Sequence, residues 1–344
     1  MNTIMLDKIG SATYNLDLDQ EIGMSDAVVA EEGAVVIVEV LEDKKTYNQL
    51  ELPSGRLSTL KKGDIVAVAL GNRRALKGFV GSVPESLNVG EVIHFLNLGG
   101  VAGICSSENL KEVGHALRAK VLGAAVRDGK TLNIKDAKRF SEKDTLESKI
   151  PLVIVSGTCM NVGKTTTTCE IIKQMFHARK KVSGAKLAGV AALRDTEKMR
   201  DYGAKKVVSF IDAGYPSTVD GKERPVGVAK GAIDYLSLDC PDYIVIEFGD
   251  GIYGEYGVLD ILKDPQIQAA IIAHIGCAHD PVGAVKLAEV CREIGAPLHA
   301  VSGPVTDNSV GCDFIHKNLN LPAFNALYQG AELFTCLEKI CLQK

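Results

Sequence analysis

Residues 151–168 read PLVIVSGTCMNVGKTTTT and decide the fold of the second half of the chain. The apolar, β-branched run 152–155 predicts a buried strand, and a glycine-bounded loop leads from it into a segment of helical period that begins near Lys164. This order predicts a phosphate-binding loop, because backbone amides and the positive end of a helix converge on one point. Five residues separate Gly157 from Gly163, one more than in the usual loop.

The loop supplies the residues that we expect to bind a nucleotide. Lys164 is expected to reach the β- and γ-phosphate oxygens, and the hydroxyl group of Thr165 is expected to hold Mg²⁺. The other loop residues expected to surround the phosphates are Gly157, Thr158, Asn161, Val162, Gly163 and Thr166.

The segment GTCMNVGKT resembles the G-T-x-x-x-V-G-K-T loop of dethiobiotin synthetase and its relatives, a P-loop branch that also holds the MinD, nitrogenase iron-protein and cobyrinic-acid amidase families. Two later stretches, KKVSGAKLAGV and PDYIVIEFGDGIYG, are similar to the synthetase strands that end in Lys-Pro-Val and in Val-Glu-Gly-Ala-Gly-Gly. The likeness covers about residues 150–325. This sequence departs from the family pattern, because Leu187 replaces the proline and Phe248 and Asp250 interrupt the glycine run. The resemblance therefore implies nucleotide binding by this chain, but not the synthetase's own substrate.

The resemblance also implies roles for charged residues at the ends of strands. Lys186 occupies the position of the substrate-facing lysine, and Glu247 that of the magnesium-binding glutamate. In the resembled family an aspartate completes the magnesium site. Asp195 and Asp201 are both candidates for this role, because their spacing in the sequence does not distinguish them. Asp195 as a helix N-cap is the structural alternative. A lysine that ends a buried strand needs a partner, which favours an anionic substrate beside Lys186.

Further polar residues follow the predicted strands, where ligands gather in open α/β sheets. His274, Cys277 and His279 lie close together in sequence but lack an obvious fourth ligand, so a substrate role for His279 is favoured over a zinc site. Asp307 and Asn308 lie where the resembled branch carries its base-recognition loop, and an Asx turn is the alternative. The residues assigned to the substrate are Lys186, Asp212, Ser217, Thr218, Asp250 and His279.

The chain is expected to form two domains joined by a linker. Residues 1–136 carry short apolar runs between turn clusters, which predicts a small antiparallel barrel or sandwich. Residues 137–149 are charged and predict an exposed, partly helical linker, and residues 150–344 alternate strand and helix signals, as in a doubly wound, mostly parallel α/β sheet. The expected strands are 152–155, 182–185, 243–247, 269–274 and 298–302, and the expected helices include 164–178 and 282–294.

Two loops of the first domain contain residues that can bind a ligand. GNRRALKG, residues 71–78, places Arg73, Arg74 and Lys77 in a glycine-bounded loop that can grip an anion. LNLGGVAGICSS, residues 96–107, is glycine-rich with hydroxyl, thiol and amide groups. The structural alternatives are a solvated surface turn for the first loop and close backbone packing for the second. A helix is also expected over 109–119, followed by a hairpin that turns at residues 128–129.

Composition limits the class of protein. The chain has 344 residues, of which 46% are hydrophobic and 24% charged, and a net charge of −4. This charge gives no electrostatic reason to expect a nucleic-acid or membrane partner. Its cysteines form no C-x-x-C pair, and its start lacks a basic segment followed by a long apolar one, so we expect reduced thiols and a cytoplasmic protein.

These features together predict an ATP-binding, Mg²⁺-dependent enzyme, with GTP as the other possible nucleotide. It is expected to transfer a phosphoryl group to a small anion, favoured to be a carboxylate, as a ligase or synthetase, a kinase or an NTP hydrolase. Lys164, Lys186 and Glu247 are the expected catalytic residues, and a homodimer is expected from the resemblance. The alternative is a nucleotide-switched NTPase that acts as a scaffold or metallochaperone. The loop lacks the early lysine that often reaches across a dimer in such proteins, which weakens this alternative.

Overall fold

The computed structural model describes residues 2–219 and 224–341, and the chain divides into two compact units. The barrel unit comprises Met1–Arg139, Val190–Arg194 and Phe210–Val219. The P-loop unit comprises Phe140–Gly189, Asp195–Ser209 and Asp220–Lys344. The predicted domains are consecutive in sequence, whereas these units are not, because two segments from the second half of the chain belong to the barrel unit.

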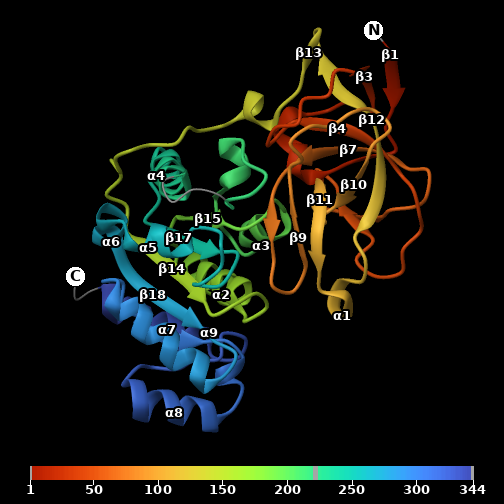
Figure 1. Cartoon of the computed structure of the whole chain (residues 1–344). Helices are drawn as coiled ribbons and strands as arrows, with labels where there is room; N and C mark the ends of the chain where they lie inside the picture. Colours follow the sequence, from red (N-terminus) through yellow and green to blue (C-terminus); the bar gives the residue numbers. More distant parts are fainter. Residues whose placement is uncertain (1, 220–223, 342–344) are drawn as a thin grey trace. The chain divides into compact units, whose positions relative to one another are not determined.

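The barrel unit is built mainly from strands (Figure 1). Its strands are β1 (Asn2–Met5), β2 (Lys8–Ile9), β3 (Glu21–Ser25), β4 (Val35–Val40), β5 (Gln49–Glu51), β6 (Leu57–Thr59), β7 (Ile65–Leu70), β8 (Arg73–Arg74), β9 (Phe79–Ser82), β10 (Val92–Phe95), β11 (Val101–Glu108), β12 (Leu117–Arg127) and β13 (Lys130–Thr131). Its helical turns are η1 (Ser11–Leu16), α1 (Leu110–Val113), η2 (Ile134–Ala137) and η3 (Phe210–Ala213).

Strands β4, β7, β11, β10 and β12 pair in a closed circuit, which makes the centre of the unit a small barrel. Alternate residues of each strand fill the interior, for example Val36 and Val38 of β4 and Val66 and Val68 of β7, all fully buried. The predicted strand-rich first domain is therefore confirmed, and of the two expected forms, barrel or sandwich, it has the barrel. It is not purely antiparallel, because β11 runs parallel to β7.

The predicted hairpin is present, whereas the predicted helix over 109–119 is mostly wrong. Asp128 and Gly129 both have positive φ angles and turn the chain between β12 and β13. The helix is the short α1, and it ends at Gly114, whose φ is 64°. Leu117 and Ala119 beyond it belong to β12, because their side chains complete the barrel core.

The P-loop unit alternates strands and helices, as expected from the sequence (Figure 1). Its strands are β14 (Leu152–Gly157), β15 (Val182–Ala188), β16 (Lys206–Ser209), β17 (Tyr243–Phe248), β18 (Ile271–Cys277) and β19 (Ala300–Ser302). Its helices are α2 (Lys164–His177), α3 (Arg194–Asp201), α4 (Arg224–Ser237), α5 (Val258–Lys263), α6 (Pro265–Ala270), α7 (Pro281–Glu293), η4 (Pro304–Thr306), α8 (Ser309–Leu319) and α9 (Gly330–Cys341), and the first residue of α3 falls in the barrel unit.

The six strands form one parallel sheet in the order β16-β15-β17-β14-β18-β19. The expected doubly wound parallel sheet is confirmed, with each predicted strand in place to within a few residues. Val153 and Val155 of β14 pack in one core cluster with α2 and α9, and Leu152 and Ile154, which alternate with them, are also fully buried. Helix α4 packs on β15 and β16, and α7 packs on β18. Because β14 is buried on both faces, it reads as an uninterrupted apolar run.

The segment expected to be an exposed linker packs against α4 within the P-loop unit. Asp234 of α4 accepts hydrogen bonds from the backbone amides of Glu147 (3.1 Å) and Ser148 (2.7 Å) and forms an ion pair with Lys143 (2.8 Å). A side chain in place of Gly231 would come within 2.1 Å of the carbonyl oxygen of Ser141, so glycine permits this close approach. The expectation of partial helix here is wrong, because residues 140–149 form no helical turn.

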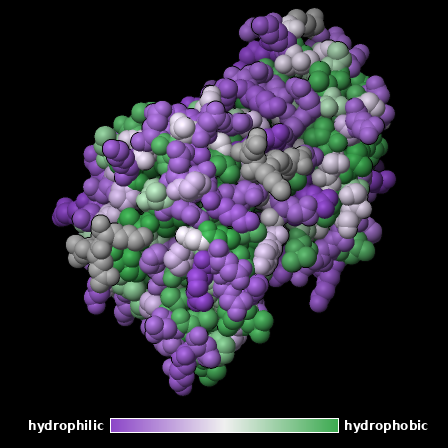
Figure 2. Space-filling model, turned by 60° about the vertical axis from the view of Figure 1, so that its left-hand side comes forward, coloured by the Kyte–Doolittle hydropathy of each residue, from purple (hydrophilic) through white to green (hydrophobic). Residues whose placement is uncertain are grey.

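Hydrophilic residues cover much of the face drawn in Figure 2, and they interrupt the hydrophobic ones. In the described part of the chain, no helix combines the length and apolar composition needed to cross a membrane. The cysteines whose side chains the structure describes are free thiols.

Replacing buried Asp234 by alanine is expected to destabilise the P-loop unit by about 2–4 kcal/mol, because two backbone amides and Lys143 lose their acceptor. Urea unfolding followed by circular dichroism measures this loss. Asp239→Ala is the matched control, since Asp239 is exposed and forms a surface ion pair with Lys206, and should cost less than about 1 kcal/mol. Equal losses in the two variants would contradict the anchoring role of Asp234.

Candidate functional site

The phosphate loop lies between β14 and α2, as predicted. Asn161 and Gly163 have positive φ angles (60° and 85°) and turn the loop into the helix. Gly163 is the N-cap of α2 and has no side chain to cap the first amides, so these amides remain available to a ligand. The ammonium group of Lys164 folds back and donates a hydrogen bond of 2.6 Å to the carbonyl oxygen of Cys159.

Strand register brings two charged residues beside the loop. Lys186 of β15 pairs with Glu247 of β17, and Glu247 pairs in turn with Val155 of β14, which ends two residues later in Gly157. Because the strands are parallel, all three ends meet at the carboxyl edge of the sheet, the edge where such folds bind ligands.

One carboxylate oxygen of Glu247 accepts a hydrogen bond and the other does not. Its Oε1 accepts a hydrogen bond of 2.6 Å from the hydroxyl group of Thr165, while its buried Oε2 has no partner. Burial raises the pKa of Glu247 to about 7, and the nearby charge of Asp195 adds to the rise. A buried carboxylate oxygen that accepts no hydrogen bond from the protein is available as a ligand for a cation.

Lys186 and Asp195 form an ion pair with an N–O distance of 2.5 Å, and their side chains are only 7% and 13% exposed. Asp201 lies six residues further along α3, about 240° around the helix, and is exposed. Of the two candidate aspartates, Asp195 therefore faces Lys186 and Glu247, and Asp201 does not.

The oxygen atoms around Glu247 suit a magnesium ion. The hydroxyl of Thr165, the free oxygen of Glu247 and the carboxylate of Asp195 are hard ligands, and Mg²⁺ is usually held by one or two carboxylates together with phosphate and water. No group of three or more His, Cys, Asp or Glu side chains suited to a metal occurs among the described residues. The arrangement thus fits an ion that a bound nucleotide helps to coordinate.

The loop after β17 lies against the phosphate loop. The amide of Ile252 donates a 2.8 Å hydrogen bond to the carbonyl oxygen of Gly157, and a side chain in place of Gly251 would come within 2.3 Å of the carbonyl oxygen of Thr158. This close contact buries Asp250 near Lys164. Burial lowers the pKa of Lys164, and the charges of Glu247 and Asp250 oppose that effect.

Three residues assigned to the substrate belong to the barrel unit instead. Asp212 is buried there, accepts hydrogen bonds from Tyr14 and Asn15, and pairs with Arg139 at 3.4 Å. Ser217 and Thr218 are buried in the same unit. A substrate role for these three residues stays a prediction.

The remaining candidates are exposed residues near helix starts. His279 is exposed just before Asp280, which caps α7. Asn308 caps α8 through a hydrogen bond from the amide of Val310, so the local turn considered for it is present. Asp307 accepts a 3.0 Å hydrogen bond from Asn325, a residue that no motif in the sequence indicated.

The sequence suggested His274 only as a ligand of a disfavoured zinc site, and the structure shows a different role for it at the end of β14. The ring of His274 is fully buried, with Nδ1 2.8 Å from the carbonyl oxygen of Ala296 and Nε2 2.7 Å from the hydroxyl of Ser156. A carbonyl oxygen only accepts, so Nδ1 carries the proton and Nε2 accepts from Ser156. Burial lowers the pKa of His274 to about 4, which keeps the ring neutral in this role. The only sequence signal is that Ser156 interrupts an apolar strand.

Comparison with known proteins gives partial matches to solved structures. No protein-family model matches the chain, and no curated protein does either. The cell division protein FtsY from Thermotoga maritima matches with a TM-score of 0.39 and 18% identity, over 55% of this chain and 66% of that chain.

Two other solved structures are similar to this chain to about the same degree. A DUF1611 family protein from Anabaena variabilis matches with a TM-score of 0.41 and 11% identity, over 62% of this chain and 66% of that one. The signal recognition particle 54 kDa protein from Aeropyrum pernix matches with a TM-score of 0.36 and 16% identity, over 58% and 50%. At such scores the matches describe a partial likeness of the backbone and carry no information on what this chain binds.

The pH dependence of stability is expected to report on His274. An unfolded histidine protonates near pH 6.5 and the folded one only near pH 4, so the unfolded state binds the extra proton as the pH falls between these values. Stability is therefore lost on acidification through this window, by about 3 kcal/mol from this group.

Urea unfolding at several pH values tests the assignment. His274→Gln should show a shallower loss between pH 6.5 and 4 than the wild type, whereas His279→Gln, which changes an exposed histidine, should keep the wild-type slope. The same slope in His274→Gln as in the wild type would show that His274 does not titrate in this way.

Proposed function

We propose that the P-loop unit binds a Mg²⁺–nucleoside triphosphate and transfers its terminal phosphoryl group to a small anionic acceptor. The observation that carries the proposal is the buried, partnerless Oε2 of Glu247, beside the Thr165 hydroxyl at the start of α2. ATP is the nucleotide that we favour, and GTP is the other candidate. The resemblance to the dethiobiotin synthetase branch supports the same assignment.

The loop residues act mainly by binding and orienting the phosphates. The ammonium group of Lys164 exchanges its bond to the Cys159 carbonyl for phosphate oxygens, and the uncapped amides at the start of α2 donate to the same group. Thr165, Glu247 and Asp195 hold Mg²⁺, which neutralises phosphate charge when it is bound. The Ser156–His274 hydrogen bond holds the strand end from which the loop begins.

Lys186 is the residue proposed to bind the acceptor. Its ammonium group lies at the same sheet edge as the phosphate loop and is held by Asp195, so it can attract a carboxylate toward the terminal phosphate. An acceptor carboxylate oxygen attacks the γ-phosphorus, the bond to the β,γ-bridging oxygen breaks, and the nucleoside diphosphate leaves with that electron pair. The product is an acyl phosphate, which a second nucleophile can convert to an amide or an ester.

A nucleotide-switched NTPase is the second candidate, and the division of the chain favours it. Residues 190–194 follow β15 after Gly189 and belong to the barrel unit, and Asp195 is the next residue. A change in the position of Asp195 on nucleotide binding would thus act on a segment of the other unit. In this reading water is the acceptor, and the expected homodimer provides the assembly that changes.

Lys164→Ala is expected to weaken nucleotide binding at least about tenfold, because one charge-assisted contact to phosphate contributes roughly 1.5–3 kcal/mol. Isothermal titration calorimetry with ATP and with GTP, each with and without Mg²⁺, measures the loss and identifies the nucleotide. Lys173→Ala is the matched control, since Lys173 pairs with Glu170 within the same helix. No binding of either nucleotide to the wild type would refute the proposal.

Asp195→Asn and Asp201→Asn form a second matched pair on one helix. Mg²⁺ should strengthen nucleotide binding by the wild type and by Asp201→Asn, whereas Asp195→Asn should lose most of this effect, because Asp195 faces Glu247. Titration of Mg²⁺ into the nucleotide-bound protein provides the measurement. An unchanged Mg²⁺ dependence in Asp195→Asn would remove this residue from the metal site.

Turnover distinguishes the two candidate functions. Release of nucleoside diphosphate that rises several-fold with one of a panel of small carboxylates supports the enzyme. Turnover that no carboxylate stimulates, together with a nucleotide-dependent change in sedimentation, supports the switch.

A further inference from the structure

The barrel unit brings together the two loops that the sequence singled out. Arg73, from residues 71–78, donates from Nη1 to the carbonyl oxygen of Leu96, the first residue of the glycine-rich stretch 96–107. Cys105, from that stretch, packs beside Phe79, Leu96 and Tyr47. Arg74 and Lys77 are exposed, so Arg73 is the residue of its loop that points inward.

The guanidinium group of Arg73 is buried without a carboxylate. The residue is only 3% exposed, and in the described part of the chain it forms no ion pair. Nη1 also donates to the Tyr47 hydroxyl at 2.8 Å, while the buried Nε has no hydrogen-bond partner. With Nη1 occupied, the remaining edge is formed by Nε and Nη2, whose parallel N–H groups match the two oxygens of a carboxylate.

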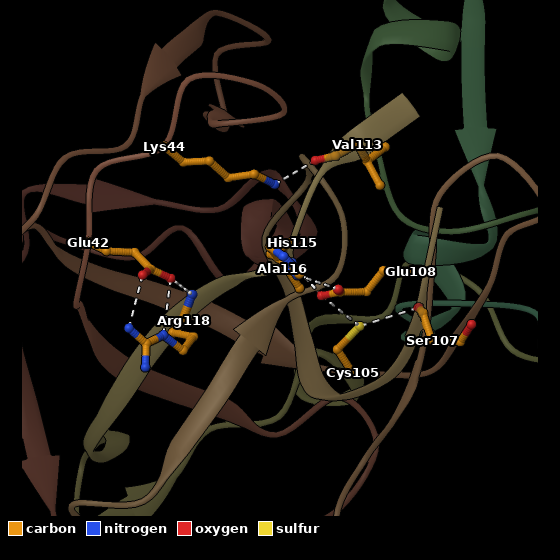
Figure 3. Close-up of polar contacts among 9 residues, drawn as sticks. All are labelled: Glu42, Lys44, Cys105, Ser107, Glu108, Val113, His115, Ala116 and Arg118. Atoms are coloured by element: carbon orange, nitrogen blue, oxygen red, sulfur yellow. Dashed lines mark hydrogen bonds and ion pairs between the residues drawn. The ribbon is translucent and has the colours of Figure 1, made fainter. Parts of the chain in front are cut away.

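Lys44 brings a second cation to the same two aromatic rings. Its ammonium nitrogen lies 5.1 Å from the centre of the Phe79 ring, and the guanidinium carbon of Arg73 lies 5.8 Å from that centre. Lys44 donates a hydrogen bond of 2.7 Å to the carbonyl oxygen of Val113, as Figure 3 shows. Both cations therefore lie within 6 Å of the same two aromatic rings.

The nearby carboxylate of Glu108 already has other hydrogen-bond partners. Glu108 accepts from the amide of Ala116 at 2.6 Å and lies 2.8 Å from Nδ1 of His115, contacts that Figure 3 displays together with Cys105. Neither Lys44 nor Arg73 forms an ion pair with it. Glu108 and Glu42 therefore act on Lys44 only from a distance, and among the described residues neither Lys44 nor Arg73 has a carboxylate in direct contact.

We propose that the barrel unit binds a small organic carboxylate between Arg73 and Lys44. The carboxylate oxygens accept from Nε and Nη2 of Arg73, and one of them replaces the Val113 carbonyl as the acceptor for Lys44. The carbon chain of the ligand packs against Tyr47 and Phe79, next to Cys105. This site is independent of the nucleotide and of the proposed phosphoryl transfer.

The experiment uses the full chain and two probes, acetate and succinate, at constant ionic strength. Calorimetry measures affinity, and mass spectrometry after iodoacetamide treatment measures the alkylation of each cysteine. The carboxylates should slow alkylation of Cys105 and leave that of the exposed Cys240 unchanged. Arg73→Lys keeps the charge but loses the two-pronged edge, so it should weaken binding at least about tenfold, whereas Arg74→Lys on the same loop should bind as the wild type does.

Lys44→Met tests the site without touching buried Arg73, and it should also weaken binding and remove the protection of Cys105. Inorganic phosphate is the third probe, and binding of phosphate without either carboxylate would overturn the assigned ligand class. The proposal also fails if neither carboxylate binds up to about 10 mM, a range that includes weak small-ligand sites, or if Arg73→Lys binds as the wild type does.

Discussion

The register of three parallel strands determines the chemistry of the P-loop unit. Val155, Glu247 and Lys186 are neighbours across β14, β17 and β15, so the loop, the acid and the lysine reach one edge together. A shift of one residue in β17 would turn Glu247 to the other face of the sheet. The apolar runs that fix this register also bury Glu247, whose second oxygen has no hydrogen-bond partner.

The sequence predicts the parts of this arrangement that depend on local pattern. Residues 151–168, the five predicted strands of the P-loop unit and helices α2 and α7 follow from apolar runs and glycine positions. Strand β16 (Lys206–Ser209) has only four residues at the sheet edge, and its short run does not stand out from the surrounding loop. The helix expected over 109–119 fails because Leu117 and Ala119 complete a barrel core that forms from distant strands.

The sequence alone does not distinguish between similar residues whose roles depend on the three-dimensional structure. Asp195 and Asp201 have equal claims in sequence, and only the rotation of α3 separates them. Arg73 and Arg74 are adjacent, yet alternation along β8 buries one and exposes the other. The roles of Ser156 and His274 depend on a contact between residues 118 positions apart, which periodicity does not reveal. The barrel interior is filled by valine and leucine, so ligand chemistry in that unit belongs to its outer loops.

The chain passes between the units five times, after Arg139, Gly189, Arg194, Ser209 and Val219. Within the barrel unit, the carboxylate of Glu51 accepts from the amides of Leu193 and Arg194, so a short piece of the second half of the sequence is fastened among residues of the first. A gene fragment that ends near residue 139 would therefore encode all the barrel strands but not the two later segments that complete the unit. Exchange of either half of the gene alone would leave the carboxylate of Glu51 without the amides of Leu193 and Arg194 as its partners.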